Sequence, residues 1–466
     1  MSSRAELVDK ISAYLTSLGP GAIQMLARSI ETARANGDMD AALELVMEAV
    51  QRITLSPEER ARRLARPEAE FFSGVESFVI DRTPGWKRPA RISRSSLAPI
   101  WSWLHREMFS PRFSELQLDN EDAVVGMSDG DVSDIVGKFR AHCMRQLSDT
   151  LVDASSSQKM TQHFSAQLGS EEIFQDLNDI VYYNSIEPLI TRFSQSLPPV
   201  IEKITDGGEK SLIKKLQLFI HQRPDDQEWA FASLIPRLSN QALLAEIAVK
   251  LAGSDDVRKI ERSLGQTPLG LIHYDLAGHV KAITDISRGQ PKLDTVKTHL
   301  NAYHDMLRRV SVTLDLESPS ELNKSISVLR NEISGWIDQE ISSISGLMRR
   351  TLRVPKDGSG SVPEFDEHTV DDCERAMAVL DIAKRIKSSL ALNQSLGKVT
   401  KEVEQSFEVL FNGVLATMRD AHGELYHYCE QVTDAGIRFG SVYFGDDYAD
   451  LLRRQRGAAQ KQSAAG

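Results

Sequence analysis

The sequence contains no long apolar run. None of its apolar stretches approaches the roughly 18–20 consecutive apolar residues that a helix needs to cross a bilayer. This excludes an integral membrane protein built from helical spans. The N-terminal residues are polar and amphipathic and hold no apolar signal core. We therefore expect a cytoplasmic chain, with peripheral contact to a membrane left open as an alternative.

Cysteines are also scarce. The 466 residues include three, Cys143, Cys373 and Cys429. Their odd number and wide separation argue against a disulfide framework, and they lack the close pairs of a cysteine zinc site. This use of cysteine is consistent with a reducing compartment.

The common motifs of catalysis are missing too. The sequence holds no phosphate-binding P-loop, no nucleophile elbow and no H-E-x-x-H zinc helix. An enzyme is therefore not the favoured interpretation, although an active site without a recognisable motif stays open. No cofactor is expected.

Helical spacing, by contrast, runs through almost the whole chain. Apolar residues recur every three or four positions, as in Leu7, Ile11 and Leu15. One strand-like run lies at 437–444. We predict an all-α protein whose multi-helix N-terminal and middle regions precede an elongated antiparallel bundle of long helices.

Helix starts and chain breaks divide the sequence into regions. Capping serines predict helix starts at Ser56 and Ser170, and the segment 318–321 predicts the start of a long helix. The regions that we expect are an N-terminal helical region at 1–116, an acidic linker at 117–131, a compact multi-helix domain at 131–289, a long-helix bundle at 291–435 with a flexible linker at 354–366, and an aromatic segment with a disordered tail at 436–466.

One segment of the N-terminal region resembles a single tetratricopeptide hairpin. The matching residues are Gly37 and Asp38, the small residues Ala42 and Ala49, and Pro57. The resemblance implies two helices that approach closely. Since the sequence contains no second copy, a generic helical hairpin is the favoured interpretation.

The net charge is −11 and is unevenly distributed. Residues Arg52–Phe113 hold 12 Arg and Lys against 7 Asp and Glu, a net of +5, whereas Ser114–Glu187 hold 4 against 14, a net of −10. The two blocks could steer a partner, pair with each other within the fold, or form a solvated surface.

The basic block contains a stretch that predicts an exposed loop at 82–94. Its cations lie among prolines and a glycine, and a loop of this kind could bind nucleic acid or an anionic membrane. The acidic net charge makes nucleic acid an unlikely partner. The candidate residues are Arg82, Lys87, Arg88, Arg91 and Arg94.

A histidine and a His-Asp doublet suggest one enzymatic alternative. His279, His304 and Asp305 resemble the metal ligands of HD-domain phosphohydrolases, which are also all-helical. The resemblance implies a divalent metal that activates water, with a later Asp366 or Asp371 as the final ligand. The competing interpretation places His304 and Asp305 on the polar face of a helix.

The favoured function is that of a non-enzymatic helical adaptor or scaffold that binds another protein. Heptad-like seams are also compatible with a homodimer. Near the C-terminus an aromatic segment could serve as a docking peptide. Its candidate residues are Tyr443, Phe444, Tyr448, Leu451 and Leu452. The alternative for this segment is a final helix that packs on the bundle.

Overall fold

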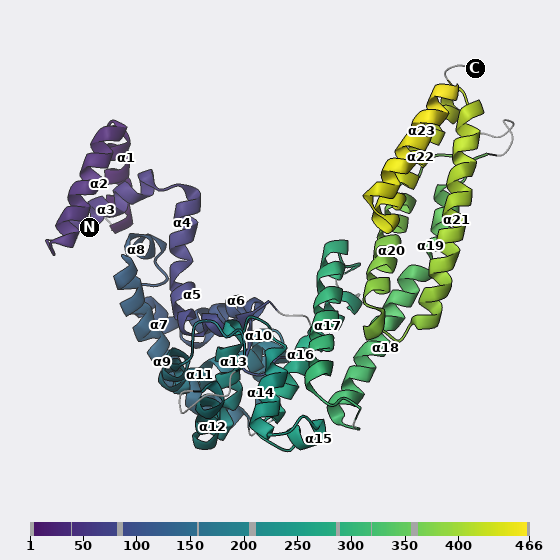
Figure 1. The fold of residues 1–466 in the computed structure, drawn as a ribbon. Helices are drawn as coiled ribbons and strands as arrows, with labels where there is room; N and C mark the ends of the chain where they lie inside the picture. Colours follow the sequence, from purple (N-terminus) through teal and green to yellow (C-terminus); the bar gives the residue numbers. More distant parts are fainter. Residues whose placement is uncertain are drawn as a thin grey trace. The chain divides into compact units, whose positions relative to one another are not determined.

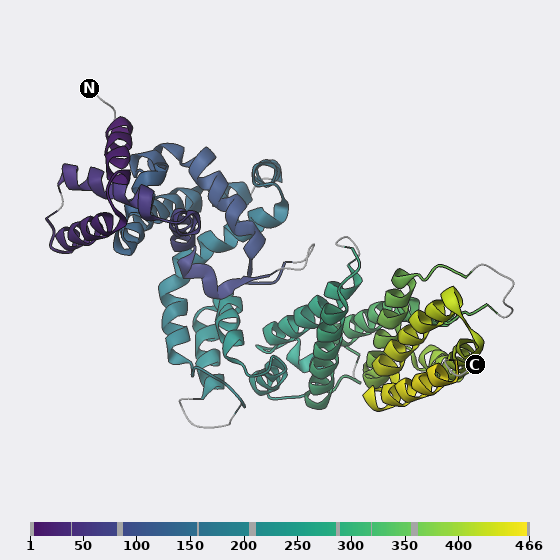
Figure 2. The ribbon, with the colours of Figure 1, turned by 90° about the horizontal axis from the view of Figure 1, so that it is seen from above.

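A computed structural model gives the fold (Figures 1 and 2). The residues that the structure describes are 4–38, 40–81, 87–155, 158–204, 211–285, 289–317, 319–355 and 362–463. They are almost entirely helical, which confirms the expected all-α class. In the described part of the chain, no helix has both the length and the apolar character required to cross a bilayer.

The chain forms two compact units. Unit 1 comprises residues 1–198 and 228–236, and unit 2 comprises 199–227 and 237–466. The division of the chain into four regions stays a prediction.

Unit 1 is built mainly from helices of moderate length. These are α1 (Arg4–Thr16), α2 (Pro20–Ala35), α3 (Ala41–Thr54), α4 (Pro57–Leu64), α5 (Arg66–Phe71), α6 (Arg94–Trp103), α7 (Ser110–Glu115), α8 (Glu121–Gly126), α9 (Asp129–Ser155), α10 (Gln158–Leu168), α11 (Glu171–Ser196) and most of α13 (Gln227–Leu234). A 3₁₀ turn at Ser73–Phe78 (η1) precedes the two-residue strand β1 (Val79–Ile80), which pairs in parallel with β2 (Ile92–Ser93). A π-helical turn at Leu104–Met108 (η2) follows α6.

Unit 2 contains the longer helices of the C-terminal half. They are α12 (Leu212–Gln222), α14 (Leu243–Ala252), α15 (Val257–Ile260), α16 (Gln266–Thr284), α17 (Leu293–Thr313), α18 (Glu321–Ser342), α19 (Ile344–Thr351), α20 (Glu367–Arg385), α21 (Asn393–Asp420), α22 (Gly423–Phe444) and α23 (Asp446–Ser463). The 3₁₀ turns are η3 (Pro224–Asp226), η4 (Ile235–Arg237), which spans the end of the unit 1 segment, and η6 (Lys387–Ser389).

Side-chain caps set several of the helix starts. Ser56 accepts a hydrogen bond from the amide of Glu59 at 3.1 Å, and Ser170 and Ser320 each cap a helix in the same way. The three predicted starts are confirmed. The helix that contains the tetratricopeptide-like alanines is capped by Asp40, and it packs more extensively on α1 than on α2. The tetratricopeptide resemblance itself stays a prediction.

The acidic segment at 117–131, expected to be a linker, instead forms α8 and the start of α9. Four arginines from α2, α4 and α5 bind it, and we call them the arginine clasp. They are Arg34, Arg60, Arg63 and Arg66, and they donate to four consecutive carbonyls at 124–127 and to the carboxylates of Glu121, Asp122, Asp129 and Asp131. The expectation of a linker is wrong because these carbonyls, at the end of a helix, find guanidinium donors.

A second prediction, of a strand-like run near the C-terminus, is also wrong. The strand-like run at 437–444 lies inside this helix, which packs against α20, α21 and α23; Figure 2 shows α22 and α23 in yellow, side by side. A helix with neighbours on several sides buries residues all round, so its apolar residues no longer show a clear helical period. Gly436 and Gly440 allow the close approach, because a Cβ there would lie 2.5 Å from the ring of Phe411 and 2.6 Å from Leu452.

The C-terminal tail also differs from expectation. Residues 457–463, expected to be disordered, continue α23. The remainder of that expectation, at 464–466, lies outside the described residues, as do residues 356–361 of the flexible linker expected at 354–366.

Loss of Arg66 should destabilise unit 1. Arg66 donates to Val124 O at 3.0 Å, to Met127 O at 2.9 Å and to Asp129 at 2.8 Å. We expect Arg66→Ala to lower the free energy of unfolding by about 2 kcal/mol. Arg66→Lys should recover little, because a single ammonium cannot span three acceptors. The measurement is the urea midpoint by tryptophan fluorescence, since four of the five tryptophans belong to unit 1.

A matched control for this prediction is Arg62→Ala. The Arg62 side chain is 77% exposed and pairs with Glu59 on the same helix, so its loss should cost less than about 0.5 kcal/mol. Equal midpoints for the Arg66 and Arg62 variants would contradict a structural role for the clasp.

Candidate functional site

The candidate site is a groove in unit 1 of about 640 Å³, which we call the aromatic groove. Its floor is a cluster of three rings, in which the centroid of His105 lies 5.2 Å from that of Trp101 and 4.8 Å from that of Phe113, and the rings of Trp101 and Phe113 also contact each other. The ring of Trp101 also packs against Phe71 and Phe139 of the core. The groove thus has an apolar aromatic floor that the core holds in place.

The π-helical turn η2 positions the middle of this floor. The amide of Phe109 donates to Leu104 O at 2.8 Å, five residues earlier, so the turn holds one residue more than an α-helical turn. Helix α7 then begins at Ser110, has Pro111 in its first turn and carries Phe113. Insertions of this kind occur often at functional sites.

His105 is held in one orientation and one tautomer. Its Nδ1 lies 2.7 Å from the carbonyl oxygen of Trp101, which can only accept, so Nδ1 carries the proton. Burial lowers the pKa of His105; the hydrogen bond to Trp101 opposes this effect, and the positive charge of Arg106 adds to it. The ring is therefore neutral at pH 7, with its lone pair on Nε2.

Arg106 stands at the edge of the floor. Its Nε donates to His105 Nε2 at 3.3 Å. The side chain is exposed, and no carboxylate among the described residues forms an ion pair with it. The guanidinium thus keeps its outer nitrogens available beside the rings.

The remaining walls combine apolar and polar groups. Apolar contacts come from Leu64, Pro67, Leu118 and Val124, and hydroxyls come from Ser102 and Ser110. The acidic groups on the far rim are already engaged. Asp119 accepts from Ser114 at 2.6 Å, and Glu121 accepts from Arg60 of the clasp at 3.3 Å.

Sequence reasoning did not identify this groove as a site. The spacing of Trp101 and His105, four residues apart, is a signal that two rings share one helix face. The extra residue of the π-helical turn has no comparable sequence signal, and it decides where Arg106 and Phe113 lie.

The residues of the predicted metal site do not come together. His279 on α16 faces His299 on α17, with their Nδ1 atoms 3.0 Å apart, whereas His304 contacts the hydroxyl of Ser389 at 2.8 Å. Among the residues that the structure describes, no three His, Cys, Asp or Glu side chains could hold a metal ion. The predicted arrangement of His279, His304 and Asp305 is therefore wrong.

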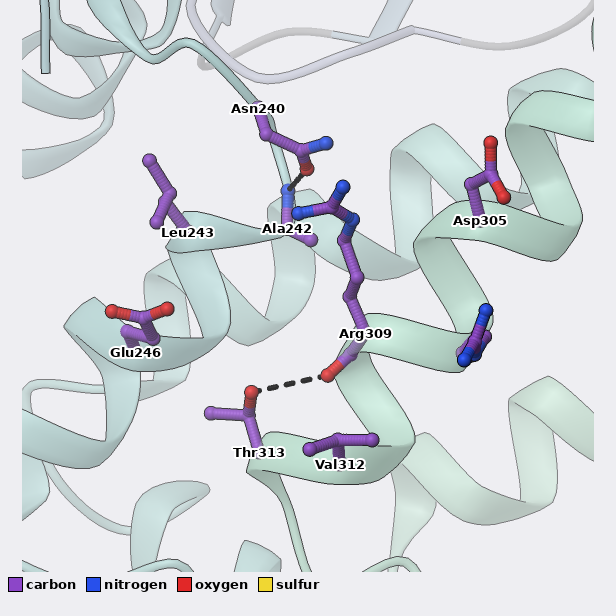
Figure 3. Close-up of a pocket in the computed structure, with 9 residues that line it drawn as sticks. Asn240, Ala242, Leu243, Glu246, Asp305, Arg309, Val312 and Thr313 are labelled. Carbon is purple, nitrogen blue, oxygen red and sulfur yellow. Dashed lines mark hydrogen bonds between the residues drawn. The ribbon is translucent and has the colours of Figure 1, made fainter. Parts of the chain in front are cut away.

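Asp305 lies instead in a second groove, in unit 2, of about 400 Å³ between α14 and α17. Figure 3 shows the guanidinium of Arg309 reaching towards Asn240, while the carboxylate of Asp305 points away from it. Glu246 lies on the opposite wall, and Val312 is 84% exposed at the edge. This groove presents charges of both signs without an aromatic floor.

The predicted basic loop is turned inward over its described part. Lys87 pairs with Asp176, which is 0% exposed, and with Asp179 at 2.6 Å. Asp176 also accepts from the amide of Ser93 at 3.1 Å and the hydroxyl of Ser96 at 2.5 Å. Burial raises the pKa of Asp179, although Lys87 opposes this effect.

Arg91 is also turned inward. It is 4% exposed and donates to Ser77 O at 3.1 Å and to Ala232 O at 2.8 Å. Arg88 is partly buried, and Arg94 is exposed but paired with Glu76 at 2.9 Å. The prediction of an exposed basic surface is therefore wrong for Lys87 and Arg91. Arg82 lies outside the described residues.

The aromatic segment near the C-terminus packs within unit 2. Tyr443 and Leu452 are buried, and the ring of Phe444 lies 5.5 Å from Phe407 and 4.6 Å from Tyr448. Leu451 is 42% exposed. The segment is thus part of helices α22 and α23 and not a free docking peptide.

Comparison with models of protein families, with curated proteins and with solved structures finds no match to the chain. The function proposed below follows from the geometry of the described side chains.

Removal of Asp176 should strongly destabilise unit 1. Because Lys87 and the Ser93 amide would be left without their buried partner, we expect Asp176→Ala to cost about 3–5 kcal/mol and Asp176→Asn to cost less. Urea unfolding followed by tryptophan fluorescence measures this.

The control for Asp176 is Asp134→Ala, at an exposed position on α9. Its midpoint should match that of the wild type. If the Asp176 and Asp134 variants unfold at the same urea concentration, the buried pair does not support the fold.

The His279–His299 contact should make unit 2 sensitive to acid. Burial and the neighbouring His299 lower the pKa of His279 from its ordinary value of 6.5 to about 4. The unfolded chain therefore binds more protons between these values, and stability falls as the pH drops from 6.5 towards 4, by at most about 3 kcal/mol. Thermal unfolding by circular dichroism at pH 7, 5.5 and 4.5 measures the slope.

In the variant His279→Asn, most of this pH dependence should disappear. The pKa of His299 is also lowered by burial, so a smaller slope should remain. His427→Asn, at a side chain that is 78% exposed, should retain the full slope. An unchanged slope in His279→Asn would disprove the assignment.

Proposed function

We propose that the chain is a non-enzymatic helical adaptor of the cytoplasm that binds another protein, and that the aromatic groove receives a segment of this partner. The observation that carries the proposal is the exposed side chain of Arg106, whose guanidinium bonds to one member of a cluster of three rings. Tryptophan and arginine are the residues that most often dominate protein-binding energy.

The openness of the groove supports a peptide as the occupant. The side chains of Arg106, Ser114, Asp119 and Glu121 on its rim are exposed. A site for a small molecule usually encloses most of its ligand. A groove between short helices, with apolar walls and free hydroxyls, is instead typical of a site that accepts an extended or helical segment.

The alternatives from the sequence receive less support. A phosphohydrolase would need a metal site, and the groups predicted for it make separate contacts. Binding of nucleic acid or an anionic membrane would need cations that instead bind Asp176 and backbone carbonyls.

Blocking the groove should release the partner. In Ser102→Trp, a large side chain would fill the groove while leaving the rings of Trp101, His105 and Phe113 unchanged. We expect affinity capture of the tagged chain from its native host, with quantitative mass spectrometry, to recover a stoichiometric partner that Ser102→Trp reduces at least tenfold. Purified partner should show the same loss in a direct titration.

The control is Ser148→Trp, at an exposed position on α9 of the same unit. It should capture as much partner as the wild type. Equal recovery by the Ser102 and Ser148 variants, or no stoichiometric partner with the wild type, would contradict docking at the groove.

A further inference from the structure

We infer that the segment bound in the aromatic groove is an acidic peptide in which one Asp or Glu, next to an apolar side chain, pairs with Arg106. This inference rests on the proposed function and names the chemistry of the partner.

The Arg106 guanidinium uses one of its nitrogens within the fold. Its Nε donates to His105 Nε2 and the side chain is exposed, so the edge formed by its two terminal nitrogens is available to an anion. No carboxylate within the described ranges pairs with it. This edge matches the two oxygens of a carboxylate, and such bidentate pairs are strong and directional.

This arrangement is also rigid. His105 is fixed by its bond to Trp101 O at 2.7 Å and by contact with the rings of Trp101 and Phe113. Since His105 is neutral and its Nε2 can only accept, it orients Arg106 without neutralising its charge. The cation therefore loses less conformational freedom on binding an anion than a free surface arginine would.

The groove also has an apolar half. Beside Arg106 lie the ring of Phe113 and the half-buried ring of Trp101, facing Leu64 and Val124. A volume of about 640 Å³ accommodates more than one side chain. An apolar or aromatic residue adjacent to the acid would cover these rings and exclude water from the ion pair, which strengthens it.

Negative charge on the rim of the groove limits the number of acids that a bound peptide can carry. Asp119 and Glu121 on the far rim are exposed carboxylates, and they would repel a second negative charge. A polyacidic tract is therefore disfavoured, and the groove selects a single acid on the side of Arg106 followed by apolar character.

The experiment is peptide selection on the purified full-length chain. A random peptide library is displayed against the wild type, Arg106→Glu, Ser102→Trp and Arg145→Glu. Arg145 is an exposed arginine on α9 with no ion pair among the described residues, and it serves as the matched control. All variants are first compared by circular dichroism and urea midpoint.

The expected result has two parts. The wild type and Arg145→Glu should enrich peptides with one Asp or Glu beside an apolar residue, whereas Arg106→Glu should enrich Lys or Arg at that position. For a selected peptide, replacing its acid by the amide should weaken binding to the wild type at least tenfold and leave binding to Arg106→Ala unchanged, as in a double-mutant cycle.

Two outcomes would overturn the inference alone. If selected peptides lose binding to Ser102→Trp but show no acid, or if Arg106→Glu selects the same peptides, the groove binds a segment of other chemistry and the proposed function stands. If phenylacetate binds in an Arg106-dependent way while no peptide does, the site takes a small carboxylate, and the proposed function is contradicted together with the inference.

Two further outcomes would also remove the proposed function. Peptides that bind Ser102→Trp as well as the wild type would use another surface. A library that enriches nothing, together with no binding of phenylacetate, would show that the groove is not a binding site.

Discussion

Unit 1 depends on the arginine clasp at the end of α8. A helix of six residues is far too short to be stable alone. Its last carbonyls would normally remain without partners, and the clasp supplies guanidinium donors from helices that lie about 60 to 90 residues earlier in the chain. The clasp thus converts an acidic stretch with few large apolar residues into a fixed wall.

This wall has a direct consequence for the candidate site. Val124 of α8 faces the aromatic groove, and Glu121 at the start of α8 forms part of its far rim. Arg60 engages Glu121 and Asp122, so these acids are not the partners of Arg106. The same interaction that positions the wall therefore leaves the cation of the groove available. Cations elsewhere in unit 1, such as Lys87 and Arg91, serve the core.

The sequence was a good guide where local chemistry decides the structure. Ser56, Ser170 and Ser320 cap helices because a hydroxyl next to free amides is a local interaction. The opposite net charges of the blocks 52–113 and 114–187 predict, as one alternative, ion pairs within the fold. Arg60 and Arg66 of the clasp form such pairs with Glu121, Asp122 and Asp129. The sequence misled where tertiary packing decides, as in α22, whose apolar residues follow the demands of its neighbours on several sides.

The candidate site shows the same limit more sharply. Trp101 and His105 are four residues apart in the sequence, but the contact of Phe113 with them also depends on one extra residue in the turn at 104–108. One residue corresponds to about 100° of rotation in an α-helix, so the extra residue changes the direction in which the chain leaves the turn towards α7 and Phe113. The hydrogen bond from the Phe109 amide to Leu104 O thus fixes the backbone turn that carries Arg106. A site that depends on such a non-local choice can be found in a structure, and residue types alone do not reveal it.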